Sequence, residues 1–141
     1  MAEFTFDYYP DPDQNSLTGE LKYVYRPKIP IRLSYKHTML KYPFHALVDS
    51  GADGNLFPYE FCTHLGINLK KGEYHKHIGI GSQGLDAYRH VVKMFVGTYS
   101  FETKIDFAIG QQIPLLGRME FFRFFKRVTF NEKEKKVYLT S

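Results

Sequence analysis

Short apolar stretches, most of them alternating with polar residues, follow one another along the chain, and glycine or proline separates them. This pattern is typical of β-strands joined by turns. In the stretch 101–109, Ile105, Phe107 and Ile109 are expected on one face, with Lys104 and Asp106 on the other. The pattern predicts a mainly β protein with strands at residues 21–25, 29–35, 44–48, 74–80, 85–96, 101–109, 128–130 and 137–139.

Two short helices are expected between these strands. Residues 58–65 begin with proline and end before Gly66, a residue that favours the end of a helix. Residues 118–126 carry four phenylalanines that would form one broad apolar face, and we expect them to pack in the core. Residues 10–20, PDPDQNSLTGE, contain two prolines and show no periodic pattern, which predicts a polar loop.

The 141 residues are enough for one domain with its own core, and 13 Phe and 11 Tyr exclude a disordered chain. Charge is unevenly distributed: residues 1–20 hold five carboxylates and no Lys or Arg, whereas the rest holds 19 basic and 10 acidic residues. We therefore expect an N-terminal extension over 1–20 and a folded domain over 21–141. The lysines are scattered and no nucleic-acid-binding motif accompanies them, so we expect a solvated basic surface and no nucleic-acid partner.

Cysteine and histidine usage limits the possible cofactors. Cys62 is the single cysteine, which excludes an intrachain disulfide and favours a reducing, cytoplasmic environment. We expect it to be a buried apolar residue in the first helix. His75 and His77 would share one strand face but lack further ligands, so no metal and no cofactor is expected. The sequence also has no run of 18 apolar residues and no signal-peptide pattern, so no membrane partner is expected.

The most informative segment is residues 46–54, ALVDSGADG, where an apolar strand leads directly into Asp49. A carboxylate at the end of a buried strand is costly unless hydrogen bonds compensate its burial. Ser50 can donate such a bond, and Gly51 allows the backbone to approach closely. These residue types suit a carboxylate held for chemistry. The alternative is an ordinary turn, in which Asp and Gly are common.

Four motifs in the correct order resemble the retropepsin-like aspartic proteases, the single-domain family that includes the retroviral proteases. The similarity spans about residues 29–139 and implies a closed β-barrel of the acid-protease type with one or two short helices, acting as a homodimer. The matching motifs are the active-site loop at 46–53, the strand and helix at 55–58 and 62–67, the Gly-rich flap at 78–84, and Pro114-Leu-Leu-Gly-Arg118.

The resemblance assigns a role to each matching position. Asp49 would be the catalytic aspartate, Ser50 would brace the two active-site loops and Gly51 would contact the catalytic pair and the substrate. Arg118 would form an ion pair with Asp53; the alternative is an exposed Arg118 at the start of a helix. The remaining positions implied are Ala52, Asp53, Gly79, Ile80, Gly81 and Ser82 for substrate binding, and Leu116, Gly117 and Arg118 for structural support.

Aspartic-protease chemistry needs two carboxylates, but only Asp49 is followed by Ser-Gly or Thr-Gly. We therefore predict a symmetric homodimer in which two Asp49 carboxyls share one proton and activate a water. An endopeptidase of this kind would show a bell-shaped pH profile on the acidic side of neutrality. A flap over residues 74–88 would close on an extended peptide, with hydrophobic residues expected beside the cleaved bond.

Two questions stay open at the level of sequence. The chain could instead be a catalytically silent module that dimerises or binds peptides through the same fold. The acidic residues 1–20 could be a self-cleaved leader, a strand of the dimer interface, or a segment that blocks its own active site.

Overall fold

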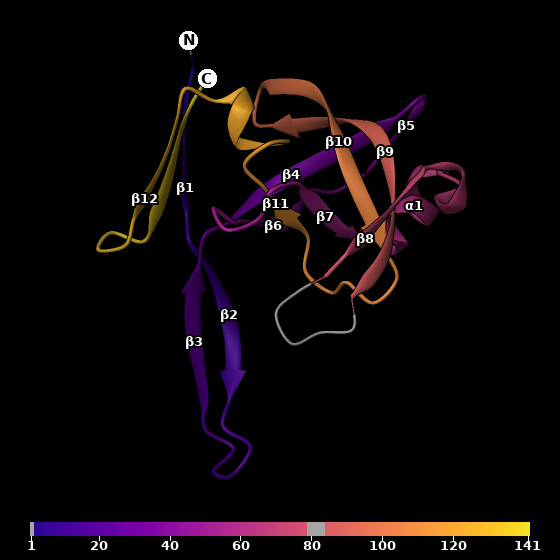
Figure 1. Ribbon diagram of the computed structural model, residues 1–141. Helices are drawn as coiled ribbons and strands as arrows, with labels where there is room; N and C mark the ends of the chain where they lie inside the picture. The colour runs from indigo at the N-terminus through magenta and orange to yellow at the C-terminus, as the bar shows by residue number, and fades with distance from the viewer. Residues whose placement is uncertain (1, 79–83) are drawn as a thin grey trace.

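The computed structural model describes residues 2–78 and 84–141, and this part of the chain is built mainly of β-strands (Figure 1). It contains one α-helix, α1 (Glu60–Leu65), and two 3-10 turns, η1 (Leu69–Lys71) and η2 (Phe122–Phe124). None of the described helices is long and apolar enough to cross a membrane. The strands are β1 (Glu3–Asp7), β2 (Tyr9–Gln14), β3 (Leu21–Arg26), β4 (Lys28–Tyr35), β5 (Thr38–Met39), β6 (Phe44–Val48), β7 (Asn55–Pro58), β8 (Glu73–His77), β9 (Leu85–Val96), β10 (Tyr99–Ala108), β11 (Leu115–Leu116), β12 (Arg127–Asn131) and β13 (Lys136–Thr140).

Six strands form a closed barrel, which confirms the prediction of a mainly β protein with a closed β-barrel. They pair in the order β4-β6-β11-β7-β10-β9, and a second pairing of β9 with β4 closes the ring. Closure removes unpaired edges from the barrel. Alternate residues of these strands point inward and form the core, in which the largest side chains without exposed surface include Phe57, Phe107, Ile31, Met94 and Leu116.

The two ends of the chain lie side by side in a separate sheet. β1 pairs with β13, and β13 pairs with β12, so residues 3–7 are held by the last strand. The backbone amide of Ala2 donates to the hydroxyl of Ser141 at 2.9 Å, and Lys136 forms an ion pair with Asp7 at 2.7 Å. Part of the acidic N-terminal segment is therefore a strand of this sheet. The boundary between an extension over 1–20 and a domain over 21–141 stays a prediction.

The prediction of a polar loop at 10–20 is wrong for its first half. Tyr9–Gln14 form β2, which pairs with β3 as an antiparallel hairpin. Only alternate residues of a strand donate their amides to the same neighbouring strand. Pro10 and Pro12 are two residues apart, so the backbone nitrogens of both can face away from β3, where no hydrogen bond to β3 is lost. Asn15 then accepts backbone hydrogen bonds from Leu17 and Thr18 in the connecting turn.

The predicted helix over 118–126 is also wrong, because only the single turn η2 forms there. A helix would need the carbonyl of Glu120 to accept from the amide of Phe124. Instead that carbonyl accepts from the side chains of Asn55 and Thr103, and the Phe124 amide donates to Phe121. The expectation that the phenylalanines pack in the core is confirmed, since all four are buried or half-buried.

Asp106, predicted on the face of its strand opposite Ile105 and Phe107, is 2 % exposed. Arg89 donates to its carboxylate from Nε at 2.7 Å and from Nη2 at 3.1 Å, and the ring of His77 lies at 2.7 Å. Burial alone would raise the pKa of Asp106, but the hydrogen bonds from Arg89 and His77 lower it below its usual range. The cluster joins β8, β9 and β10. The prediction for Ile109 is wrong, because β10 ends at Ala108 and leaves Ile109 exposed.

Replacing Asp106 with asparagine is expected to lower the free energy of unfolding by roughly 2 kcal/mol near neutral pH. A carboxyl whose folded pKa is lowered stabilises the protein above the unfolded pKa of about 4, and this contribution is lost as the pH falls through the folded value. The difference from wild type should therefore shrink in acid. Urea unfolding followed by circular dichroism at several pH values measures it. Asp86, exposed and bonded only to Tyr74 among the described residues, provides the matched control Asp86→Asn; an equal effect of both changes would contradict the prediction.

Candidate active site

Asp49 lies where the buried strand β6 ends. β6 pairs with β4 on one side and with β11 on the other. Its last residue, Val48, donates its amide to the carbonyl of Pro27 at 2.9 Å. The next amide, of Asp49 itself, donates to the carbonyl of Leu116 at 2.9 Å. The backbone of Asp49 is thus fixed by the barrel, while its side chain is half-buried.

The carboxylate of Asp49 is oriented by its own loop. The amide of Gly51 donates to Oδ1 of Asp49 at 2.9 Å, and the amide of Ala52 donates to the Asp49 carbonyl at 3.2 Å. A Cβ at position 51 would lie 3.3 Å from that same Oδ1, so glycine fits this close approach well. Ser50 is exposed, and its hydroxyl makes no hydrogen bond within the described part of the chain.

The far side of the loop is bonded to the segment after β11. The amide of Arg118 donates to the carbonyl of Ala52 at 2.9 Å, and the amide of Met119 donates to the carbonyl of Asp53 at 2.7 Å. Between these bonds Gly117 packs directly on the backbone of Gly54, and a Cβ at 117 would overlap the Gly54 carbonyl oxygen. The segment predicted to support the loop does lie against it.

Asn55 is a residue of this site that the sequence reasoning missed. It is 1 % exposed, and its Oδ1 accepts from the amide of Gly117 at 3.1 Å. Its Nδ2 donates to the carbonyls of Lys104 and Glu120 at 3.1 and 3.0 Å. One amide thus ties together β7, β10 and the segment after β11. The only signal in the sequence was a polar residue at the start of an apolar strand.

The predicted ion pair between Asp53 and Arg118 is not formed among the described residues. Arg118 is exposed, and its guanidinium lies 5.9 Å from the ring centre of Phe122. The backbone bonds of Ala52 and Asp53 to the segment after β11 make the connection that the ion pair was expected to make. The carboxylate of Asp53 is therefore exposed and free of other side chains in this part of the molecule.

Both strands of the hairpin predicted as a flap are present. β8 pairs with β9 from Glu73 opposite Arg89 to His77 opposite Leu85. The four residues expected to contact substrate here, Gly79, Ile80, Gly81 and Ser82, lie outside the described residues, so their role stays a prediction.

Other candidate chemistry in the described chain lies apart from Asp49. Cys62 is 2 % exposed in α1, and burial raises the pKa of its thiol to about 12, which confirms a buried apolar role and leaves no thiolate at neutral pH. His75 and His77 instead lie beside Glu73 and Asp106 respectively. Among the described residues, no group of three or more His, Cys, Asp or Glu side chains could hold a metal ion.

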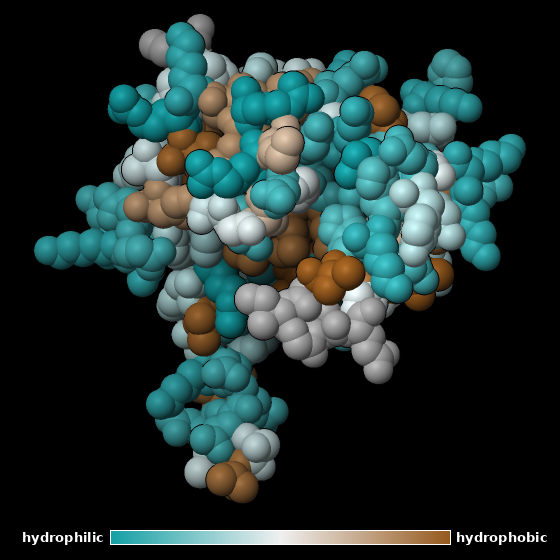
Figure 2. All heavy atoms as spheres, in the orientation of Figure 1, coloured by the Kyte–Doolittle hydropathy of each residue, from teal (hydrophilic) through white to brown (hydrophobic). Residues whose placement is uncertain are grey.

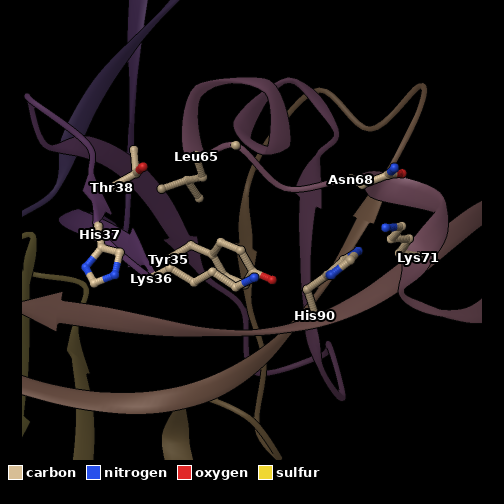
Figure 3. A pocket seen from close by; sticks show the side chains of 9 residues that line it. Tyr35, Lys36, His37, Thr38, Leu65, Asn68, Lys71 and His90 are labelled. Atoms are coloured by element: carbon tan, nitrogen blue, oxygen red, sulfur yellow. The ribbon is translucent and has the colours of Figure 1, made fainter.

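One surface hollow of about 440 Å³ lies between the β4–β5 turn, the end of α1 and β9 (Figure 3). It is lined by lysines and histidines from these elements, and the lining contains no carboxylate, thiol or serine. It therefore offers no carboxylate of the kind that aspartic-protease chemistry needs. The lining residues are Tyr35, Lys36, His37, Thr38, Leu65, Gly66, Asn68, Lys71 and His90.

Comparison with known proteins gives matches in structure only. No protein-family model matches the sequence, and no curated protein matches it either. The chain is similar to the crystal structure of a retropepsin-like aspartic protease from Rickettsia conorii, with a TM-score of 0.65 and 18% identity over 98% of this chain and 89% of that one. EIAV protease in complex with the inhibitor HBY-793 has a TM-score of 0.49 and 18% identity over 75% of this chain and 88% of its own.

The likeness to the Rickettsia structure is wider than the sequence motifs, which begin near residue 29. It takes in most of residues 1–20, in agreement with the place of β1 in the terminal sheet. The chain therefore has the fold of the retropepsin-like aspartic proteases.

Proposed function

We propose that this chain is an aspartic endopeptidase whose active site is completed by a second copy of itself. The observation that carries the proposal is the Asp49 loop: a carboxylate at the end of a barrel strand, oriented by the Gly51 amide and fixed through its backbone to Leu116. The likeness in fold to a protein described as an aspartic protease supports the same activity. No single residue of the loop could carry out the reaction alone.

The second carboxylate comes from the partner's Asp49 across a two-fold axis. Two carboxyls about 3 Å apart cannot both be ionised, so they hold one proton between them. The exposed hydroxyl of Ser50 has no partner in the described chain and is proposed to brace the opposite loop. Symmetric dimers are the commonest assemblies of soluble proteins, and here symmetry supplies the missing half of the site.

Hydrolysis then proceeds without a covalent intermediate. The ionised carboxylate takes a proton from a water held between the two Asp49 side chains, and the water oxygen attacks the carbonyl carbon of the peptide. The protonated carboxyl gives its proton to the carbonyl oxygen, forming a gem-diol. One diol proton returns to a carboxylate while the amide nitrogen takes the other carboxyl's proton, the C–N bond breaks, and an acid and an amine leave.

The substrate is an extended peptide that lies between the loop and the β8–β9 hairpin. The free carboxylate of Asp53 can accept from a peptide amide beside the catalytic pair, and Ala52 borders the same side of the loop. A peptide bound as an added strand would place its side chains alternately on the two sides. Hydrophobic residues on either side of the cleaved bond stay the expected preference.

Incubation with a mixed peptide library over an acidic pH series tests the proposal. Wild-type protein should cleave peptides with a bell-shaped pH profile, and pepstatin should inhibit the cleavage. Asp49→Asn serves as the control for a contaminating protease, and mass spectrometry identifies the products. Equal cleavage by both proteins would remove the peptidase function. Binding of peptides without cleavage would instead favour the silent module.

A further inference from the structure

The β2–β3 hairpin, residues 9–26, projects from the barrel and is called the arm below. It forms a sheet of two strands that pairs with no other described strand. Figures 1 and 2 show it standing clear of the rest of the molecule. Every residue of β3 is exposed. Because an isolated two-stranded hairpin is marginally stable in water, an arm of this length should gain stability when another surface covers it.

The two faces of the arm differ sharply in chemistry. Residues opposite each other in an antiparallel pair share a face, and the register places Pro10 with Tyr25, Pro12 with Tyr23, and Gln14 with Leu21. This docking face carries no charge and is wholly exposed; Leu21, Tyr23 and Tyr25 have 53, 55 and 52 % of their surface in solvent.

The opposite face already has a role in attaching the arm to the barrel. Asp11 forms ion pairs with Arg26 at 3.1 Å and with Lys28 at 2.7 Å. The ring of Tyr9 lies 4.5 Å from that of His45, measured between ring centres. Burial favours a raised pKa for Asp11, but the hydrogen bonds from Lys28 and Arg26 lower it. The docking face is therefore the one left available for a partner.

The two prolines also determine how a partner can bind. Proline has no amide hydrogen, so β2 cannot donate to a further strand at positions 10 and 12. Prolines at such positions protect an edge against strand addition. A partner would therefore lie flat on the docking face and would not extend the sheet at this edge.

Building on the proposed function, we propose that the docking face lies against the second copy of this chain that completes the active site. The base of the arm lies beside the Asp49 loop. The carbonyl of Pro27, directly after β3, accepts from the amide of Val48, directly before Asp49. Two Asp49 carboxyls can meet only if the two-fold axis passes close to both. The same axis brings the second copy to the base of the arm, so each arm reaches across to the other copy.

Charge and area support this occupant. The arm carries three carboxylates and two cations, whereas the rest of the chain has 17 basic and 12 acidic residues, so the arm and the body of a second copy have net charges of opposite sign. A large side chain buries roughly 200 Å² in full, so three half-exposed ones offer roughly 300 Å². A standard interface needs about 800 Å² per partner. The docking face thus supplies a substantial part of the area that a stable interface needs, and the surface around Asp49 would supply the rest.

A pair of matched double variants tests the proposal. Tyr23→Ser/Tyr25→Ser removes the aromatic rings of the docking face, and Lys22→Ser/Val24→Ser changes the same number of exposed residues on the opposite face. Sedimentation over a concentration series should show the dimer dissociation constant at least about tenfold higher for the first variant and unchanged for the second. Peptide hydrolysis per mole should fall for the first variant at low protein concentration and recover at high concentration.

The outcomes separate this proposal from the peptidase function. Equal dissociation constants for wild type and the docking-face variant overturn the docking, and hydrolysis by wild type would then leave the peptidase function intact. A wild type that dimerises through the docking face but cleaves no peptide supports the docking and removes the peptidase function. A wild type that stays monomeric at every concentration overturns the docking.

Discussion

Replacing Asp49 with asparagine is expected to lower the rate of peptide hydrolysis at least about 1000-fold while leaving the fold intact. Asparagine has nearly the same shape and keeps the oxygen that accepts from the Gly51 amide. It cannot take a proton from water, so the base of the proposed mechanism is lost. The measurement is kcat/KM on a peptide identified in the library, with the urea midpoint as the check on folding. An active variant with an unchanged midpoint would contradict the role of Asp49.

Mixing the variant with wild type tests whether one site needs two chains. If each active site takes one Asp49 from each of two copies, and the copies exchange freely, activity at constant total protein falls as the square of the wild-type fraction. An equal mixture should then retain about a quarter of the activity. A site built within one chain would retain about half. The two curves differ most clearly near equal amounts, where the measurement should be concentrated.

Asp53→Asn is the matched control within the same loop. Asp53 is exposed and has no ion pair in the described chain, so the change should leave the urea midpoint and kcat nearly unchanged. Because the proposed role of Asp53 is to bind the peptide backbone, KM should rise. A loss of kcat equal to that of Asp49→Asn would show that the two carboxylates of one chain act together.

Elements with a strong local pattern could be predicted from the sequence. The strand expected at 85–96 is observed as β9 with the same bounds, since alternation and flanking glycines define it locally. The helix predicted at 58–65 is present as α1, and its end is confirmed, because Gly66 takes the left-handed conformation that ends it. Its predicted start is wrong: α1 begins at Glu60, and Pro58 belongs to β7. The Asp49 loop was predicted because its residue types reflect local needs: an apolar strand, a carboxylate and a close backbone approach.

Features that depend on distant contacts could not be predicted. The helix predicted at 118–126 does not form, because the side chains of Asn55 and Thr103, distant in sequence, donate hydrogen bonds to the carbonyl of Glu120. Asp106 is buried because Arg89 and His77 lie beside it after folding. Both cases involve a polar group whose partner belongs to another strand. The pattern of polar and apolar residues within one segment does not show which distant residue will be such a partner.

Gly117→Ala is expected to destabilise the protein by about 3 kcal/mol or more and to abolish hydrolysis. The new methyl group would overlap the carbonyl of Gly54, which belongs to the backbone and cannot rotate away as a side chain does. Relief requires the 49–54 loop to move away from the segment after β11. That movement would break the backbone bonds that hold Ala52 and Asp53. Urea unfolding and kcat/KM on the same peptide measure the two effects.

Gly54→Ala is the control, because it changes the other residue of the Gly117–Gly54 contact. A Cβ on Gly54 meets no atom within 4 Å, and the residue does not have a positive φ, so alanine fits there. Alanine also reduces the freedom of the unfolded chain, so the free energy of unfolding should stay within about 1 kcal/mol of wild type. If both alanines had the same small effect, close packing of Gly117 on Gly54 would not be what fixes the 49–54 loop. If only Gly117→Ala lowered stability and activity together, the position of Asp49 would depend on the close packing of Gly117 on Gly54.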